Sequence, residues 1–381
     1  MNQNVRRMAA IALLQGMVFY GPVATLYRQA QGLSVFDITR IESISMALCI
    51  VLEIPWGIIA DRIGYRKTLI FCSGLAFLSK IVFWLATDFE WFLAERVMLS
   101  IVQSGTSGVD VSILCLSCDE SERQKAFGLY NAMGMAGLLF AAVIFALFIQ
   151  SRYRIAGFLT AVSYGAAMLL ATRLVEVRPK TPAHHVQRDL FLPILRQTLR
   201  NRHLLLFLIA VALLSETHQT ITVFLGQLQL ARVGLSDSGL GFAFIITTLV
   251  GTSAAFSSLV TQKLGEHASV AALCGAALAS CMALALVPLP IAAVSGIWLL
   301  RLSYSLFQPL QIAIQNRQIQ TAQRATALSI HAMLGYCLAI GTNLVFGLLS
   351  EISLAIAFFF GGGLCLISLL LLLRSSNCRK D

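Results

Sequence analysis

Apolar runs of about twenty residues recur along the whole chain, and this feature limits the fold more than any other. A helix needs about 20 mostly apolar residues to cross the roughly 30 Å hydrocarbon core of a bilayer. Charged residues make up only 12% of the 381 residues, whereas a soluble domain carries about 25%. Because so few charges cannot cover a soluble surface of this size, the sequence predicts an all-α membrane protein.

Charged residues, Gly and Pro bound twelve such runs, six on each side of a more polar break. The predicted spans are residues 8–27, 37–60, 68–87, 90–116, 125–149, 155–174, 203–229, 237–261, 267–287, 290–314, 325–349 and 352–373. The break contains several Pro and basic residues, which is typical of a linker. We therefore expect one six-helix bundle over 1–174, a cytoplasmic linker over 175–202 and a second six-helix bundle over 203–381.

The basic residues are distributed unevenly between the two faces of this predicted topology. Twenty of the 28 Lys and Arg residues fall on the face that holds the N-terminus, five fall on the opposite face and three lie inside spans. Because basic loops remain in the cytoplasm, both termini are predicted to be cytoplasmic, in a bacterial inner membrane. The net charge of +10 forms no separate basic domain, so we assign it to contacts with the lipid bilayer and expect no nucleic-acid partner.

Short sequence echoes relate the two halves. Arg62-Ile63-Gly64 recurs as Lys263-Leu264-Gly265, and Gly32-Leu33-Ser34 recurs as Gly234-Leu235-Ser236, at shifts of 201 and 202 residues. A third echo, also at 201, repeats Arg123, Ala126 and Gly134 as Arg324, Ala327 and Gly335. Since each half has an even number of helices, the repeat is parallel, and the halves are predicted to be related by a pseudo-two-fold axis along the membrane normal.

The loop between the second and third spans, residues 57–67, reads GIIADRIGYRK and matches the pattern GxxxDRxGxRK at every fixed position. A carboxylate such as Asp61 can accept hydrogen bonds from backbone N–H groups at a neighbouring helix N-terminus. Gly64 permits a tight turn, and Arg66 can reach a carboxylate such as Asp119. These groups could hold the cytoplasmic ends of the helices together.

This loop resembles the signature loop of the major facilitator superfamily. Residues 53–57 (EIPWG) resemble the EIPTG run of some bacterial members, and residues 107–110 (SGVD) resemble their SGAD stretch. The resemblance implies two six-helix bundles, transport by alternating access, and loop contacts that close the cytoplasmic side. The conformational gate residues would be Glu53, Gly57, Asp61, Arg62, Gly64, Arg66, Lys67 and Asp119. The alternative interpretation is an ordinary basic loop that only sets orientation.

Ionisable residues inside predicted spans are candidates for substrate or proton binding, because a charge at the bilayer centre costs about 2.5–3.5 kcal/mol. Glu216 and Arg301 lie near the middle of their spans. Glu216 is predicted to bind a proton or a cationic substrate group, or to form a permanent ion pair with Arg301. His218 is either a proton relay or a neutral, hydrogen-bonded core residue.

The other candidates lie in both halves. Asp110 is either a cavity carboxylate or a packing residue, and Arg96 either faces the cavity or extends toward the membrane surface. Polar side chains at helical spacing complete the predicted binding set: Gln15, Tyr20, Tyr304, Gln308 and His331.

No Walker loop, nucleophile–base pair or metal-ligand cluster is present in the sequence, so we predict no enzyme activity, no metal and no cofactor. We expect a monomeric secondary active transporter that moves a small amphiphilic or drug-like solute, by proton-coupled efflux driven by the proton gradient. Residues 128–139 lack the Pro found in the Gly-Pro-rich helix of related drug–proton antiporters. The alternatives are an uptake carrier for a small metabolite and a non-transporting membrane sensor.

Overall fold

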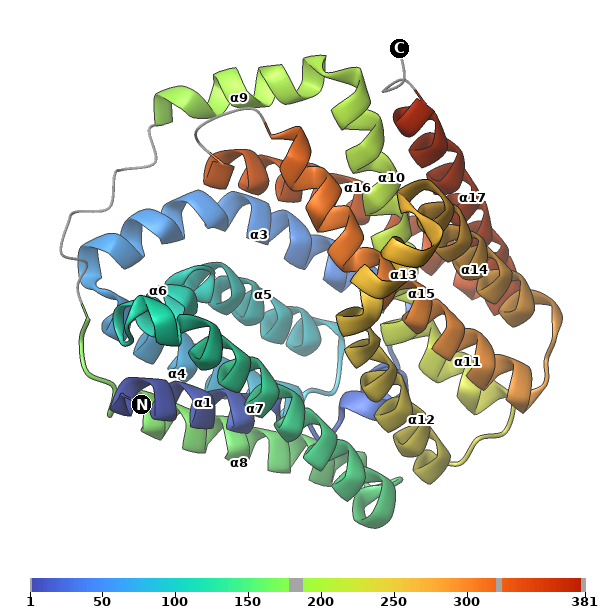
Figure 1. Cartoon of the computed structure of the whole chain (residues 1–381). Helices are drawn as coiled ribbons and strands as arrows, with labels where there is room; N and C mark the ends of the chain where they lie inside the picture. The colour runs from blue at the N-terminus through green and yellow to red at the C-terminus, as the bar shows by residue number, and fades with distance from the viewer. Residues whose placement is uncertain (1, 178–187, 320–323, 378–381) are drawn as a thin grey trace. The chain divides into compact units, whose positions relative to one another are not determined.

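The computed structural model describes residues 2–177, 188–319 and 324–377, which form helices and connecting turns without a β-strand (Figure 1). Within these residues, eleven helical stretches are long and apolar enough to cross a membrane. The 29-residue helix α3 (Val35–Ile63) lies at the place of the remaining predicted span. The prediction of an all-α membrane protein is therefore confirmed, and a total of twelve spans is consistent with these helices.

The chain divides into two compact units that do not follow the sequence order alone. Unit 1 contains Met1–Leu33, Ile44–Ala183 and Asp237–Ile245, and unit 2 contains Ser34–Ser43, His184–Ser236 and Ile246–Asp381. The helices of the first half are α1 (Gln3–Gly16), η1 (Gly21–Val23), α2 (Ala24–Ala30), α3, α4 (Tyr65–Leu85), α5 (Phe89–Thr106), α6 (Val109–Leu116), η2 (Glu120–Glu122), α7 (Arg123–Ile144), η3 (Phe145–Ile149) and α8 (Tyr153–Ala171). Those of the second half are α9 (Arg188–Arg200), α10 (Arg202–Gln219), η4 (Thr220–Leu225), α11 (Gly226–Arg232), α12 (Asp237–Val250), η5 (Gly251–Phe256), α13 (Ser257–Leu264), α14 (Glu266–Leu286), α15 (Pro290–Gln318), α16 (Arg324–Ile352) and α17 (Leu354–Asn377).

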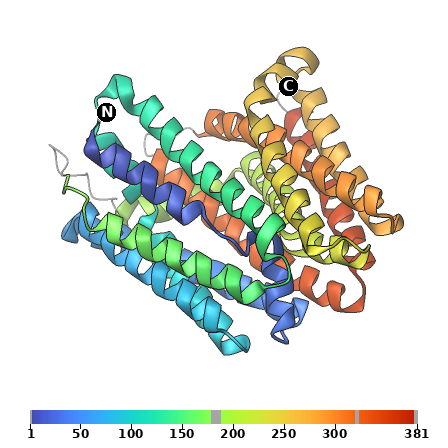
Figure 2. The same cartoon turned by 90° about the horizontal axis from the view of Figure 1, so that it is seen from below.

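The same helix pairs pack in both units. In unit 1, α1 packs on α7 and α8, and α4 packs on α5 and α8. In unit 2, α10 packs on α16 and α17, and α14 packs on α15 and α17. The long helices α1, α7 and α8 run side by side in Figure 2. The sequence echoes therefore mark two copies of one packing pattern.

Glycines at the echoed positions adopt the same unusual backbone. Gly64 and Gly265 have φ values of 95° and 81°, and Gly32 and Gly234 have φ values of 90° and 88°. Only glycine enters this left-handed region without strain. Gly64 and Gly265 directly precede α4 and α14, so the predicted tight turn at Gly64 is present in both halves.

Several spans are not single α-helices, which the sequence did not predict. Gly108, with φ at 79°, separates α5 from α6. A π-helical segment, η4, joins α10 to α11, and a 3-10 segment, η5, joins α12 to α13. Such wide or tight turns in a long helix frequently occur at functional positions, and η4 begins two residues after His218.

Two helices belong to both units. The first residues of α3 pack within unit 2, where Phe36 N donates to Glu351 Oε1 at 2.9 Å and Gly347 of α16 lies against Thr39. The first residues of α12 pack within unit 1, where Gly241 lies against Ala146. Gly347 and Ala146 are 201 residues apart and so occupy equivalent positions in the two halves. The Gly347–Thr39 contact and the Gly241–Ala146 contact are therefore repeats of each other, but the glycine is on the other side of the contact in the second case.

The predicted linker contains the 13-residue helix α9, a structure that the sequence analysis did not anticipate. Ile194 of α9 packs against Ala327 and Ile330 of α16, and Figure 1 shows α9 beside α16 and α10. The middle of the predicted linker, 178–187, lies outside the described residues. The predicted boundaries at 174 and 202 remain a prediction.

Candidate functional site

Unit 2 holds a carboxylate in the middle of a membrane-spanning helix. Glu216 lies near the centre of the stretch Arg202–Arg232 and is half-buried. Its Oε2 accepts a hydrogen bond from Nδ2 of Asn343 on α16 at 3.5 Å, and Asn343 Oδ1 accepts from the hydroxyl of Thr220 at 2.8 Å. The carboxylate of Glu42, buried on α3, interacts electrostatically with Glu216. Helices α3, α10 and α16 thus bring two carboxylates and an amide together.

A cationic group, Arg301 of α15, contacts His218, which lies two residues after Glu216 on α10. Nη1 of Arg301 on α15 is 3.4 Å from Nε2 of His218. The His218 ring stacks on Tyr304, with ring centroids 4.1 Å apart and planes 12° apart, and the Tyr304 hydroxyl is 2.9 Å from that of Ser215. Because a guanidinium only donates, Nε2 must accept, which requires a neutral His218 ring with its proton on Nδ1.

The predicted ion pair between Glu216 and Arg301 is not formed. Among the described residues, the ion pairs of unit 2 do not include either side chain. Arg301 instead faces His218, and a side chain at Gly251, where η5 begins, would overlap its guanidinium. Glu216 is therefore held by a neutral amide and is not locked to a cation.

Unit 1 holds the second predicted carboxylate. The Tyr130 hydroxyl on α7 donates to Oδ2 of Asp110 on α6 at 2.8 Å. The other oxygen, Oδ1, is buried and has no hydrogen-bond partner among the described residues. Cys72 of α4 lies beside it. Asp110 thus combines one fixed donor with one unused acceptor.

Unit 1 also contains a buried ion cluster. Nζ of Lys80 on α4 is 3.1 Å from Oε1 of Glu95 on α5 and 2.9 Å from the hydroxyl of Tyr20. Arg28 of α2 approaches the other oxygen of Glu95 at 3.8 Å. Each charged side chain is at most 6% exposed, and Tyr20 stacks on Phe83 at 4.0 Å. The predicted site residue Tyr20 therefore belongs to an ion cluster with one excess positive charge.

The signature loop is partly described. The surroundings of Gly57 and the side chain of Asp61 lie outside what the structure describes, so the predicted Asp61 contact is not tested. Arg66 does not pair with Asp119: its Nη2 donates to the carbonyl of Thr172 at 2.8 Å, and its backbone N donates to Glu176 Oε1 at 3.3 Å. The carboxylate of Glu176 thus binds the N-terminus of α4, and the contact predicted for Asp61 stays a prediction.

Among the described residues, the side chains of the other predicted gate residues form no hydrogen bond or ion pair with Arg66 or Glu176. Arg62, Lys67 and Asp119 are exposed, and Glu53 is half-buried on α3. Gly64 supplies the turn before α4, where a side chain would meet the carboxylate of Glu176.

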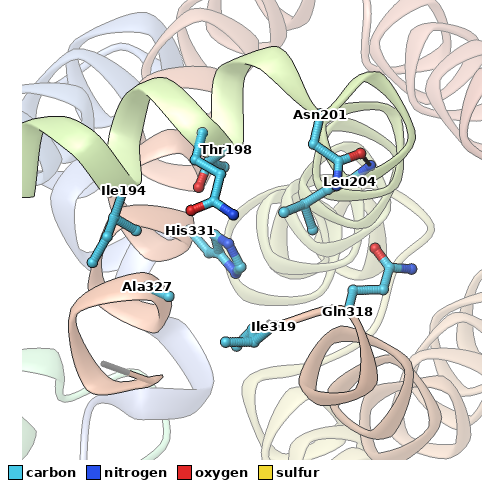
Figure 3. A pocket seen from close by; sticks show the side chains of 9 residues that line it. Ile194, Thr198, Asn201, Leu204, Gln318, Ile319, Ala327 and His331 are labelled. Carbon is cyan, nitrogen blue, oxygen red and sulfur yellow. Dashed lines mark hydrogen bonds between the residues drawn. The ribbon is translucent and has the colours of Figure 1, made fainter. Parts of the chain in front are cut away.

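A pocket in unit 2 contains the predicted residue His331 (Figure 3). Its polar lining comes from α9, α15 and α16 and consists of neutral groups. The lining residues are Ile194, Gln197, Thr198, Asn201, Leu204, Gln318, Ile319, Ala327 and His331. Nδ1 of His331 is 3.0 Å from Nε2 of Gln315. The pocket is separate from the residues around Glu216 and contains no charged side chain.

Gln15, Gln308 and Arg96 are the other predicted binding residues. Among the described contacts, none links Gln15 or Gln308 to Glu216, His218 or Asp110. Arg96 is half-buried on α5. Within the part of the chain that the structure describes, no three His, Cys, Asp or Glu side chains lie close enough to hold a metal ion.

Glu42, Glu95 and Arg28 were not among the predicted site residues. Glu42 and Glu95 lie inside predicted spans, where an acidic residue is unfavourable unless it is partnered. Lys80 is five residues from the end of α4 and Glu95 is six residues from the start of α5. Because consecutive helices run antiparallel, these two residues lie at the same depth in the membrane. Their positions in the sequence could therefore have predicted the ion pair.

Comparison with known proteins identifies the family. The model of the Major Facilitator Superfamily matches residues 8–342 of this chain.

The chain belongs to the major facilitator superfamily.

Membership of this superfamily, together with the membrane-spanning helices, makes the chain a multi-pass membrane protein. Among curated proteins, it is 24% identical over 253 residues to the methyl viologen resistance protein SmvA of Salmonella typhimurium, in strains 14028s and LT2. The alignment covers 65% of this chain and 46% of that protein, so the chain matches about half the length of these relatives.

Solved structures of the superfamily share the fold at low sequence identity. The nucleoside transporter NupG has a TM-score of 0.80 at 15% identity, over 97% of this chain and 98% of that chain. A POT family transporter in complex with 5-aminolevulinic acid has a TM-score of 0.76 at 15% identity, over 99% and 97% of the two chains. A bacterial homologue of the lysosomal transporter Spinster has a TM-score of 0.72 at 15% identity, over 98% and 94%.

Proposed function

We propose that this transporter exports a small amphiphilic compound that carries a cationic group, in exchange for protons, and that Glu216 binds both. The observation that supports the proposal is the Glu216 carboxylate in mid-span, which accepts one long hydrogen bond from Asn343 and forms no ion pair with the residues that the structure describes. A charge at this depth is unfavourable by about 2.5–3.5 kcal/mol. A proton or a cation can neutralise it, and neither can bind while the other does.

Competition for one carboxylate is the simplest basis for exchange. A proton bound to Glu216 excludes the cationic group, and departure of the proton allows the cation to bind. Glu42, which interacts electrostatically with Glu216, disfavours a state in which both carboxylates are charged. Each half of the transport cycle then leaves the site neutralised by a different ligand.

The neighbouring residues suit an amphiphile. The stacked rings of His218 and Tyr304 offer an aromatic surface next to Glu216. Arg301 contacts His218, whereas the Glu216 carboxylate contacts the Asn343 amide. An aromatic or alkyl body could pack on these rings while its cationic group reaches the carboxylate.

The direction of transport is proposed from similarity. The relatives from Salmonella typhimurium are named as methyl viologen resistance proteins, and removal from the cell is a common route to resistance. The alternative is an uptake carrier for a small metabolite. We further propose a monomer in a bacterial inner membrane, with both termini in the cytoplasm and the loop 57–67 as the cytoplasmic gate.

Transport in proteoliposomes tests the proposal. With an imposed proton gradient, the wild-type protein should move ethidium, a cationic amphiphile, against its concentration gradient and release protons in the opposite direction. Glu216→Gln should lose both movements, because the amide binds neither a proton nor a cation. The matched control is Glu120→Gln, since Glu120 is 91% exposed on its side chain and lies far along the sequence.

Two results would contradict the proposal. Ethidium transport by Glu216→Gln at the wild-type rate and with proton exchange would remove Glu216 from the mechanism. Wild-type protein that takes up a nucleoside or amino acid, but not ethidium, would favour the uptake carrier.

A further inference from the structure

We propose that the outer face of α9 binds the headgroups of anionic lipids on the membrane face where α10 begins. This helix has two unlike sides. Ile194 and Thr198, four residues apart, are buried and Ile194 packs on Ala327 and Ile330. The opposite side carries Arg196 and Arg200, also four residues apart and both exposed. One side of α9 is therefore fixed to unit 2, and the other is free to meet a ligand.

An apolar stripe lies beside the basic side chains. Leu192 and Leu199 are 71% and 46% exposed, and their spacing of seven residues places them on one face of the helix. Arg196 lies between them in the sequence and flanks the same face. Exposed leucine next to arginine is the pattern of a helix that lies in the membrane interface, with leucine in the acyl region and arginine among headgroups.

The place of α9 in the chain makes a lipid surface the fitting partner. Asn201 separates α9 from α10 and its side chain accepts from Leu204 N at 3.1 Å, so α10 begins at once. Since α10 is a membrane-spanning helix, the C-terminal end of α9 lies at the membrane surface. Arg200 and Arg202, on either side of this junction, are exposed where phosphate groups gather.

Charge complementarity selects anionic over zwitterionic lipid. Among the exposed residues from Leu192 to His203, three are Arg and none is acidic. A basic side chain near an anionic membrane surface favours binding by about fivefold. Removing two of them should therefore weaken binding of an anionic lipid by about tenfold to thirtyfold.

Native mass spectrometry of the full-length protein in detergent tests the proposal, with phosphatidylglycerol and phosphatidylcholine as probes. Wild-type protein should bind phosphatidylglycerol in preference to phosphatidylcholine. The variant R196Q/R200Q should lose most of that preference, and R196K/R200K should keep it because the charges remain. The matched control is R152Q/R154Q, which makes the same change in net charge at two exposed residues, Arg152 just before α8 and Arg154 in its first turn.

The apolar part is tested separately. Leu192→Ser with Leu199→Ser should weaken binding of phosphatidylglycerol without changing the preference between the two lipids. The proposal is overturned if wild-type protein binds both lipids equally. It is also overturned if R152Q/R154Q loses the preference as fully as R196Q/R200Q, because binding would then follow net charge and not α9.

Discussion

Nη1 of Arg301 lies 3.4 Å from Nε2 of His218, and this contact fixes the protonation of the histidine ring. An arginine remains charged and can only donate. The ring must therefore accept at Nε2, so a second proton cannot bind there while Arg301 stays in place. This geometry favours a neutral His218 over a proton relay and leaves proton binding to the carboxylates near it.

Replacing His218 separates hydrogen bonding from stacking. His218→Phe keeps an aromatic ring on Tyr304 and removes the acceptor for Arg301. A hydrogen bond to a charged group contributes about 1.5–3 kcal/mol, so His218→Phe should have a lower melting temperature in detergent than wild-type protein. His218→Gln has an amide oxygen that can accept the hydrogen bond from Arg301, so its melting temperature should fall less than that of His218→Phe. Equal melting temperatures for the two variants would contradict the role of Nε2.

The buried cluster of unit 1 predicts a strong loss of stability when its single acidic residue is neutralised. Glu95→Gln leaves the charges of Lys80 and Arg28 buried without a counterion. Breaking a buried pair in this way costs about 3–5 kcal/mol. The measurement is thermal unfolding in detergent, within a double-mutant cycle. Lys80→Met should lower the melting temperature much less in the Glu95→Gln background than in the wild-type background. If the two substitutions instead lower the melting temperature additively, Lys80 and Glu95 are not coupled.

Close packing of α3 on α16 predicts a position-specific effect of glycine replacement. A side chain at Gly347 would overlap Thr39 and approach Cα of Phe36 at 3.2 Å, whereas a side chain at Gly341, one and two-thirds turns away on the same helix, meets nothing within 4 Å. Overpacking costs about 1–3 kcal/mol. Gly347→Val should therefore lower the melting temperature while Gly341→Val leaves it near that of wild-type protein. A similar loss in both would indicate a general effect of valine on α16.

The proposed gate predicts a change in accessibility at the end of unit 1 that carries the loop 57–67. Asp61→Asn weakens any hydrogen bonds that the carboxylate accepts at a helix N-terminus. In a variant whose only cysteine is Cys118, which is half-buried after α6, a water-soluble maleimide should then react faster. Glu90→Gln, an exposed change in the first turn of α5, serves as the control. An unchanged rate for Asp61→Asn would count against the gate.

The fold was largely predictable because a bilayer restricts the chain strongly. Apolar length predicted the spans, and the tight turn predicted at Gly64 is present. The echoes predicted a repeat of the two halves, and the glycines at these positions, Gly32, Gly64, Gly234 and Gly265, all have positive φ values. The breaks at Gly108 and at Thr220–Leu225 were not predicted, because helix periodicity hardly distinguishes an α-helical turn from a π-helical one.

The sequence predicted which ionisable residues lie deep in the membrane spans, but it did not predict which side chains they contact. Glu216 and Arg301 were selected because each is ionisable and lies in mid-span, yet each faces a neutral side chain. Which residue a side chain meets depends on the rotation of each helix about its own axis, and a single sequence fixes this poorly. The partner of Arg66 was missed for a related reason, since Glu176 lies in the segment after α8 that was assigned to a linker.

Because α3 and α12 each begin in one unit and continue in the other, the two halves of the sequence are interlaced and are not joined by a tether alone. Cutting the backbone between α8 and α9 would leave each fragment with a helix whose first turns are bound to the other fragment. Two separately translated fragments should consequently assemble into one particle, and neither should be recovered as a well-folded protein in isolation.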